Sequence, residues 1–248
     1  MNMQLMSNAR VVLVEPSHPG NIGAVARAMK SMCLYRLYLV RPKRFPSADA
    51  TARAAGADDI LFDAVICDSL PEALAGCVWV VGTSARDRSI QWPMLTPRQC
   101  AVKMTEKLAH DETALVFGRE QAGLTNQELD HCHALVQIPT NSDYCSLNLA
   151  AAVQVLTYEL QLAVMQASSP VAGEVAEAGA AVSQEEMDGF YEHLEQMLVD
   201  VGYLDPEKPK KLMRRLRRMF NRTLPDRSEM NILRGVLGAA QRASRRKN

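Results

Sequence analysis

The chain has 248 residues with a formal net charge of zero, 48% of them hydrophobic and 23% charged. This length suits one large domain with a smaller one, and the composition indicates a sizeable buried core rather than a disordered chain. No apolar run approaches the ~18 residues of a membrane span, and the N-terminus lacks a basic region followed by a long apolar stretch. The six cysteines form no C-x-x-C pair, which favours reduced, buried thiols. We therefore expect a cytoplasmic protein without a membrane partner.

The zero net charge hides a strong asymmetry along the chain. From Tyr203 onward, fourteen lysines and arginines stand against four aspartates and glutamates, whereas the preceding residues hold fourteen basic and twenty-four acidic side chains. Charge segregated in this way predicts an appendage that binds a polyanion, attached to an acidic body. A solvated basic tail is the alternative, but the hydrophobic periodicity within this segment argues against it.

The first two thirds of the chain alternate between strand-like and helix-like segments. Residues 23–32 have helical spacing, with Val25, Met29 and Met32 on one side. The strand candidates are short and apolar: residues 10–15, 36–40, 59–67, 77–84, 113–118 and 134–139. Continuously apolar strands separated by helices predict an α/β fold with a parallel sheet that is covered on both faces.

The character of the sequence changes after a long apolar helix predicted over residues 146–165. Residues 166–184 are small, rich in alanine and glycine and without periodicity, which is typical of a flexible linker. We therefore predict three parts: an α/β domain over residues 1–165, a linker over 166–183 and a basic helical domain over 184–248.

Three amphipathic helices are predicted in the basic segment. Ser183 and Glu186 form a capping-box pattern that opens the first helix, and Pro209 begins the second, whose apolar stripe is surrounded by arginines. The third helix follows Asp226 or Ser228. This unit of roughly sixty residues is near the lower size limit for a domain that folds alone.

The segment after the fifth strand candidate has the glycine spacing of a phosphate-binding loop. Gly118 and Gly123 stand where such a loop places its glycines, but Leu124 replaces the lysine that neutralises phosphate. Thr125 and Glu128 form a capping-box pattern, so the loop ends there. It lies at a strand end, where open α/β sheets bind their ligands. Two turn glycines without a ligand are the simpler interpretation of this loop alone.

Two other strand ends share this polar character. The first places Asn21 before a helix and Arg27 one turn inside it, and the second enters the long helix through Ser146 and Asn148. An arginine buried on an apolar helix needs an anion or a carboxylate, but an arginine that extends to the surface is the simpler interpretation of Arg27 alone. Ser146 and Asn148 also suit the capping of the long helix, and both roles can coexist.

Together, these three segments resemble the SPOUT superfamily of methyltransferases in its 2′-O-ribose branch, the TrmH (SpoU) family. The matching motifs are Asn21 to Arg27, FGREQAGLT at residues 117–125 and IPTNSDYCSLNLAAAVQVLTYE at residues 138–159. They follow the family's order. Residues 80–93, the chain length and the basic C-terminal helices resemble most closely the TrmJ group of this family.

The resemblance implies a fold that strand order alone would not predict. Family members thread the C-terminal part of the catalytic domain through itself as a trefoil knot, although knotted chains are nearly absent among proteins. S-adenosyl-L-methionine sits among the knot loops, and two subunits pack through this region as a homodimer. The implied reaction is 2′-O-ribose methylation of a pyrimidine, C or U, at position 32 in the anticodon loop, with tRNA as the partner of the basic domain.

The resemblance also assigns the site residues. Arg27 would stabilise charge on the 2′-oxygen, hold the adjacent phosphate or, as proposed for the family, accept the proton, although a pKa above ~12 makes arginine an awkward base. Asn21 would orient Arg27 or the ribose, while Ser146 and Asn148 would complete the catalytic hydrogen-bonding shell. The implied cofactor-binding residues come from three loops: Thr83, Ser84 and Ala85; Gly118, Arg119 and Glu120; and Ile138, Cys145, Ser146 and Leu147.

Nearby charged residues have expectations of their own. Glu120 is expected to pair with an arginine of the same or the partner subunit. Arg86 and Arg88 are candidate RNA contacts, with solvated surface charge as the equal alternative. No metal is expected, because the sulfonium already makes the methyl carbon electrophilic. A metal site at residues 131–133 is disfavoured, since adjacent side chains cannot readily aim at one ion.

Two other functions stay open on the sequence alone. One is 2′-O-methylation of another tRNA or rRNA ribose. The other is a non-catalytic RNA-binding protein on a decayed SPOUT fold. The presence of four polar motif residues argues against this second function: Asn21, Arg27, Ser146 and Asn148.

Overall fold

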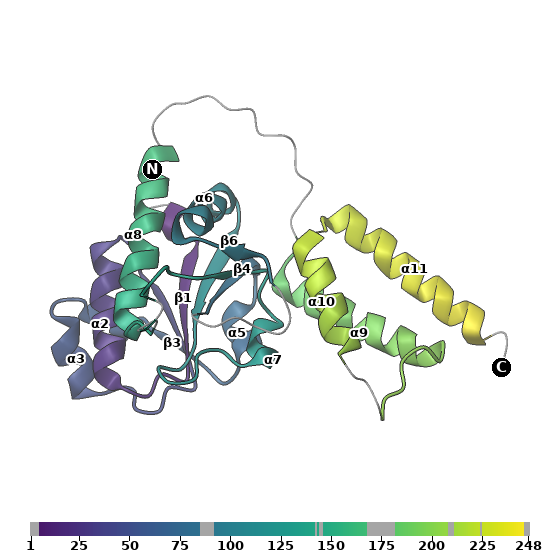
Figure 1. Cartoon of the computed structure of the whole chain (residues 1–248), viewed down its shortest axis with the longest axis horizontal. Helices are drawn as coiled ribbons and strands as arrows, with labels where there is room; N and C mark the ends of the chain where they lie inside the picture. The colour runs from purple at the N-terminus through teal and green to yellow at the C-terminus, as the bar shows by residue number, and fades with distance from the viewer. Residues whose placement is uncertain are drawn as a thin grey trace. The chain divides into compact units, whose positions relative to one another are not determined.

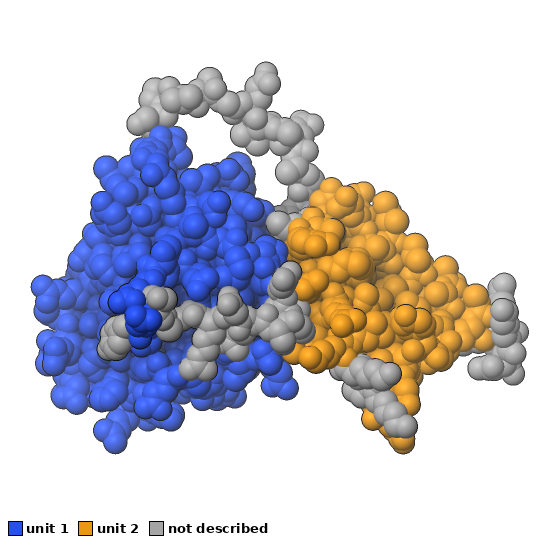
Figure 2. Space-filling view, in the orientation of Figure 1, with its two compact units in different colours: residues 1–172 blue, residues 173–248 orange. Residues whose placement is uncertain are grey.

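The computed structural model describes residues 5–84, 92–141, 143, 146–167, 182–207, 211–223 and 225–245. The chain divides into two compact units, residues 1–172 and 173–248 (Figure 2). This division falls inside the segment predicted as a linker. Most of that segment, residues 168–181, lies outside the described residues, so the linker stays a prediction.

Within the described residues, the first unit is built on a seven-stranded sheet in the order β3-β2-β1-β6-β4-β7-β5, with parallel pairing throughout (Figure 1). The strands are β1 (Ala9–Val14), β2 (Arg36–Val40), β3 (Val65–Cys67), β4 (Cys77–Thr83), β5 (Met94–Leu95), β6 (Glu112–Phe117) and β7 (Ala134–Val136). Every residue of β1 is buried, as expected of a strand covered on both faces. The predicted α/β class with a parallel sheet is confirmed, whereas the trefoil knot stays a prediction.

Helices cover both faces of this sheet (Figure 1). α8 packs against α2 and α6 on one face, and the short α5 and α7 lie on the other. The helices are α2 (Pro19–Ser31), α3 (Ala48–Ala54), α4 (Asp58–Phe62), α5 (Leu70–Leu74), α6 (Pro97–Leu108), α7 (Asn126–Leu129) and α8 (Leu149–Ala167). The capping box predicted for Thr125 and Glu128 is confirmed at the start of α7.

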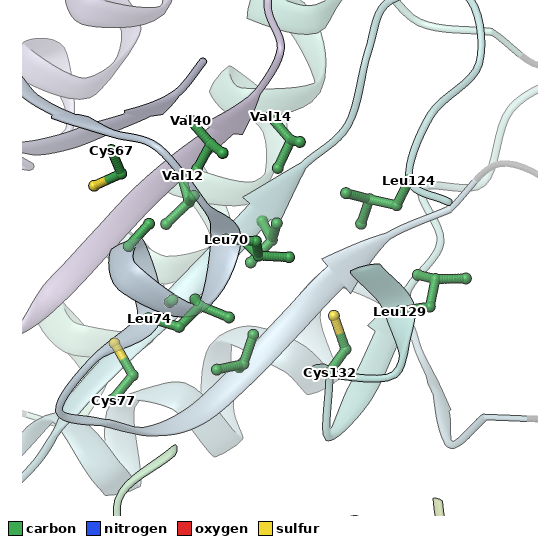
Figure 3. Packing of buried hydrophobic residues seen from close by; sticks show 14 of the residues in the cluster. Val12, Val14, Val40, Cys67, Leu70, Leu74, Cys77, Leu124, Leu129 and Cys132 are labelled. Carbon is green, nitrogen blue, oxygen red and sulfur yellow. The ribbon is translucent and has the colours of Figure 1, made fainter. Parts of the chain in front are cut away.

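A hydrophobic cluster fills the space between the sheet and the pair α5 and α7. Figure 3 shows Val12 and Val14 of β1 packed in the same cluster as Leu74 of α5. Leu124 and Leu129 extend the cluster under the loop that follows β6. Burial of one such side chain contributes about 1.5–3 kcal/mol. The cluster therefore fixes the strand ends from which the polar loops leave.

One predicted strand is wrong in its first half. Residues 59–67 were expected to form a single apolar strand, but α4 ends at Phe62 and only Val65–Cys67 pairs with β2. Asp58 in the first turn suits a helix start, and α4 buries Ile60 while Phe62 is almost fully exposed. A short apolar run does not distinguish a strand from one or two helical turns.

The second unit contains three helices among its described residues: α9 (Gln184–Asp200), α10 (Leu212–Thr223) and α11 (Arg227–Arg245). Its core is centred on two buried aromatic residues of α9, Phe190 and Tyr191. The ring of Phe190 meets that of Phe220 edge-on, with centroids 4.9 Å apart. The helical C-terminal region is therefore confirmed, with a core of its own.

The helix starts of this unit follow the sequence closely. The predicted capping box of Ser183 and Glu186 opens α9. Asp226 accepts the N–H of Glu229 at 2.8 Å, which selects Asp226 over Ser228 as the cap of α11. Pro209, predicted to begin the second helix, lies outside the described residues. No helix in the described segments combines the length and apolar character that crossing a membrane requires.

Candidate active site

The first unit contains a cavity of about 160 Å³ at the carboxyl ends of β4, β6 and β7. Parallel sheets bind ligands at this edge, where loops from neighbouring strands meet. The cavity is lined by Thr83, Ser84, Phe117, Gly118, Arg119, Glu120, Gln121, Ala122, Gly123, Val136, Ile138, Ser146, Leu147, Leu149 and Ala152. Three segments that are distant in the sequence thus meet around one space.

Every described residue that the family resemblance assigns to cofactor binding lines this cavity. These residues are Thr83, Ser84, Gly118, Arg119, Glu120, Ile138, Ser146 and Leu147. Ala85 and Cys145 belong to the same set but lie outside the described residues. Sequence reasoning missed the apolar part of the lining, including Phe117, Val136 and Leu149, because buried strand-end residues look the same whether or not they face a ligand.

The lining combines apolar walls with a few polar groups. Phe117 and Val136 are apolar, and the hydroxyl of Thr83 donates to the carbonyl of Val116 at 3.2 Å. Arg119 is the cation among the described lining residues, and its guanidinium is already engaged by carboxylates. Such a lining suits a ligand with a flat apolar ring better than a polyphosphate.

The loop after β6 folds back on itself. The N–H of Gly123 donates to the carbonyl of Arg119 at 2.9 Å. A Cβ added to Gly118 would overlap the backbone of Gly123 and Leu124, so no side chain fits there. Gly123 adopts a φ of +67°, which glycine tolerates best. Both glycines are needed for this tight turn, and the turn places main-chain groups on the cavity wall.

Glu120 anchors the start of α2. Its carboxylate accepts the N–H and the hydroxyl of Ser17 at 3.1 and 2.8 Å, the N–H of His18 at 3.2 Å and Nδ2 of Asn21 at 3.0 Å. Burial opposes ionisation, but these hydrogen bonds outweigh it and lower the pKa of Glu120 to about 2. No arginine of the same subunit pairs with Glu120 among the described residues, because the N–H groups at a helix start satisfy the carboxylate instead. An arginine of the partner subunit stays a prediction.

Asn21 connects Glu120 to the third motif. Its Nδ2 donates to Glu120, and its Oδ1 accepts Nδ2 of Asn148 at 3.0 Å. Oδ1 of Asn148 in turn accepts the N–H of Ala150 at 2.9 Å, so Asn148 caps α8 as well. No hydrogen bond joins Asn21 to Arg27 in the described structure. The amide of Asn21 is therefore oriented by residues of the two other motifs.

Arg27 lies on the exposed side of α2. Its carbonyl accepts the hydroxyl of Ser31 at 2.9 Å, but no hydrogen bond or ion pair within the described part of the chain engages its guanidinium. Its position thus matches a surface arginine whose side chain can meet an incoming anion. Arg86 and Arg88, the candidate RNA contacts, lie outside the described residues.

Sequence reasoning did not predict the ion pairs around Arg119. Its Nε lies 2.8 Å from Glu15 and its Nη2 lies 2.9 Å from Glu128. Arg41 contacts the other carboxylate oxygen of Glu15 at 2.6 Å. The hydrogen bond from Arg119 is the main cause that lowers the pKa of Glu15. A charged residue directly after a buried strand, as Glu15 is after β1, is the one signal that could have pointed to these contacts.

His133 has a structural role in the core. Its Nδ1 accepts the N–H of Val80 at 3.0 Å, and the residue is buried. Burial, together with the positive charge of Lys107, lowers the pKa of His133 to about 4 and keeps the ring neutral. Packing and this hydrogen bond explain the histidine without a metal.

The basic helix α10 divides its arginines between the interior and the surface of the second unit. Arg217 lies over the ring of Tyr191 at 4.4 Å and pairs with Asp188 at 3.0 Å, so it belongs to the packing of α10 on α9. Arg215 and Arg222 are exposed. Seven residues apart, they share one helix face.

Comparison with known families identifies the first unit. The profile of the SpoU rRNA Methylase family matches residues 8–158, which contain the first two motifs and all but the last residue of the third. The chain belongs to the SpoU methylase family. This membership confirms the predicted methyltransferase class, whose methyl donor is S-adenosylmethionine. A second profile, that of the tRNA methyltransferase TrmJ C-terminal domain, matches residues 185–248.

Known proteins match either nearly the whole chain or part of it. The tRNA (cytidine/uridine/adenosine-2′-O-)-methyltransferase TrmJ of Pseudomonas aeruginosa is 53% identical over 97% of this chain and 96% of its own. The crystal structure of TrmJ from Z. mobilis is 32% identical with a TM-score of 0.81, covering 93% of this chain and 98% of that one. A structure concerned with 2-OH methylation of C/U34 on tRNA is 27% identical with a TM-score of 0.52. That match covers 97% of the C/U34 protein but 64% of this chain.

Proposed function

We propose that this chain transfers a methyl group from S-adenosylmethionine to the ribose 2′-oxygen of a pyrimidine at position 32 in the tRNA anticodon loop. One observation carries the proposal: Gly118 and Ser146 line a single cavity, and Asn21 is held beside it by Glu120. The name of the Pseudomonas relative and the C-terminal profile support tRNA as the substrate. Such a substrate implies the cytoplasm as the place of action.

The chemistry of the cavity lining suits the methyl donor. Phe117, Val136 and Leu149 would enclose the adenine, the hydroxyls of Ser84 and Ser146 would bind polar edges, and main-chain groups of the turn would complete the site. When bound, S-adenosylmethionine supplies an electrophilic methyl carbon. The protein then has to position the acceptor oxygen and stabilise the charge on it.

Arg27 and Asn21 have the chemistry for this second task. A ribose 2′-hydroxyl is a very weak acid, so the site must stabilise negative charge as it develops on the oxygen. The guanidinium of Arg27 supplies a permanent positive charge with several donors, and it suits charge stabilisation better than proton abstraction. Asn21, with its amide oriented by Glu120 and Asn148, would hold the ribose, and the proton would leave to a phosphate oxygen of the RNA.

The position of the target nucleotide is the finer part of the proposal. The TrmJ resemblance implies position 32, whereas the C/U34 neighbour acts two nucleotides away. That neighbour leaves about a third of this chain unmatched, while the TrmJ relatives match nearly its whole length. The likeness to TrmJ over nearly the whole chain therefore supports position 32, which the TrmJ resemblance implies. Because the name of the Pseudomonas relative also includes adenosine, acceptance of a purine has to be measured alongside C and U.

We extend the proposal to a homodimer that packs through the predicted knot region. Apolar side chains in and next to α8 are unusually exposed: Leu147 by 41%, Tyr158 by 50% and Met165 by 52%. Exposed apolar patches of this kind commonly mark protein interfaces. A second copy covering α8 would remove them from water.

The proposal is tested with purified protein, methyl-labelled S-adenosylmethionine and an unmodified tRNA transcript. Mass spectrometry of the RNA fragments should locate one methyl group on the ribose of nucleotide 32, and a 2′-deoxynucleotide at that position should abolish the product. A product at nucleotide 34 or in rRNA would change the target and keep the enzyme class. Binding of tRNA without any methylation would favour the non-catalytic RNA-binding alternative.

A further inference from the structure

Two consecutive residues of the loop after β6 hold the two ends of one short segment. Arg119 contacts Glu15 through Nε at 2.8 Å, where that segment leaves β1. The next residue, Glu120, accepts hydrogen bonds from Ser17, His18 and Asn21, where the same segment begins α2. The loop that lines the cavity is thus attached to the start of α2 by neighbouring side chains of opposite charge.

Arg119 is itself held from the other side. Its Nη1 and Nη2 donate to the two carboxylate oxygens of Glu128 at 3.0 and 2.9 Å, and Glu128 also accepts the N–H of Thr125 at 2.7 Å. These side chains are shielded from water, with 22% of Arg119, 25% of Glu15 and 12% of Glu128 exposed. The planar guanidinium reaches two carboxylates in different directions, a geometry that a single lysine ammonium does not reproduce.

The segment held by Arg119 begins in an unfavourable backbone conformation. Glu15 has a φ of +48°, in the left-handed region that side chains with a Cβ seldom adopt. Contacts made by its side chain therefore help to keep the chain in this turn. This turn sets the position of α2, which carries both Asn21 and Arg27.

We infer that the contact between Arg119 and Glu15 couples the two substrates, so that a ligand in the cofactor cavity raises the affinity for tRNA. This inference rests on the proposed function. A ligand that orders the loop favours the conformation in which Arg119 and Glu120 hold the segment, and that conformation presents Asn21 and Arg27 to the RNA. By linkage, bound tRNA raises the affinity for the cofactor by the same factor.

The experiment measures tRNA affinity of the full-length protein with and without saturating S-adenosylhomocysteine, the demethylated donor, which permits no turnover. The wild type should bind tRNA about fivefold or more tightly when this ligand is present. In Glu15→Gln and in Arg119→Lys, the ratio of the two affinities should fall to about one. The matched control is Arg41→Gln, which removes the outer partner of Glu15 and should keep the wild-type ratio.

The ratio of tRNA affinities with and without S-adenosylhomocysteine distinguishes coupling between the two ligands from a purely structural role of the contact. A purely structural role would lower the melting temperature and weaken both affinities equally, leaving the ratio unchanged. An unchanged ratio in both variants, or a wild-type ratio of one, overturns the inference while methylation of tRNA still stands. Failure of the wild type to bind S-adenosylhomocysteine would overturn the proposed function together with the inference. If Arg119→Lys does not fold, the milder Glu15→Gln decides.

Discussion

Arg27 is the residue on which the proposed chemistry depends most directly. It is exposed on α2 and does not line the cofactor cavity. We expect Arg27→Ala to lower the rate of methyl transfer by about 100-fold or more, as for the loss of other groups that stabilise a developing oxyanion. The affinity for S-adenosylmethionine, measured by calorimetry, should change by less than about twofold, because that site keeps its lining.

The control for this substitution is Lys30→Ala. It removes another exposed cation of α2, whose ion pair with Asp59 lies on the surface and contributes little to stability. Lys30→Ala should keep most of its turnover. Near-normal turnover of Arg27→Ala would show that Arg27 does not have the role given to it here.

His133 makes the stability of the first unit depend on pH. Its pKa in the folded protein is about 4, below the ordinary value of a histidine, so the unfolded chain binds the proton first as pH falls. Stability from the neutral ring is complete above about pH 6.5 and is lost progressively toward pH 4, by at most about 3 kcal/mol.

Urea unfolding of the wild type and of His133→Asn at pH 7 and pH 4.5 tests this prediction. Asparagine can still accept the N–H of Val80, but it does not titrate. The free energy of unfolding should therefore fall more for the wild type than for the variant between the two pH values. Equal losses would assign the acid sensitivity to other groups.

Sequence reasoning found the motif residues but not their partners. Asn21, Gly118 and Ser146 were found because three segments in the family's order resemble its motifs, although each segment alone had a simpler interpretation. The contact between Glu15 and Arg119 was not foreseen, since it exists only because β1 and β6 are neighbours in the sheet. A single sequence does not show which strands are neighbours in the sheet. The ion pairs of Arg119 could therefore be found only in the structure.

At the scale of elements, the four longer strands β1, β2, β4 and β6 were predicted to within one residue, whereas the short strands and short helices were predicted poorly. The strand at residues 36–40 has the predicted bounds, because its apolar run from Leu37 to Val40 lies between Arg36 and Arg41. Helix α6 was not predicted, although Thr96 and Gln99 form a capping box at its start. Short helices such as α4 are held by packing against other elements, and their local pattern is too brief to show a period.

The loop after β6 gives a prediction about its two glycines, Gly118 and Gly123. In Gly118→Ala, the new methyl group would overlap the backbone of Gly123 and force the turn open. We expect the affinity for S-adenosylmethionine, measured by calorimetry, to fall by about tenfold or more, in line with a lost 1.4 kcal/mol. Gly123→Ala is the milder comparison, because its Cβ would meet open space and only its φ of +67° is strained, so the affinity should fall less. Equal affinities of the two variants would contradict this account of the turn.

Helix α10 gives a second prediction at this scale. Replacing both exposed residues, Arg215→Ala and Arg222→Ala, should weaken tRNA binding. The slope of the logarithm of the affinity against the logarithm of salt concentration should become shallower by about two, one for each lost phosphate contact. The melting temperature should not change. Arg217→Ala should instead lower it, because Arg217 packs over Tyr191. Filter binding at several salt concentrations and calorimetry distinguish the two effects.

For the whole molecule, the separation of charge predicts a separation of tasks. The cavity belongs to the first unit, and the profile of the TrmJ C-terminal domain falls in the second. Deletion of residues 184–248 should raise the KM for tRNA by about tenfold or more while the affinity for S-adenosylmethionine stays within about twofold, because basic phosphate contacts dominate nucleic-acid affinity. Unchanged tRNA binding by the truncated chain would remove the second unit from RNA docking.

The order in which the cavity wall is encoded has a consequence for synthesis. Its lining begins at Thr83 and is complete only with Ala152 in α8, so no shorter nascent chain possesses the pocket. The methyl donor cannot assist the early collapse of the sheet on the ribosome. It can bind only after α8 has docked on the sheet, so donor binding would report completed folding of the first unit.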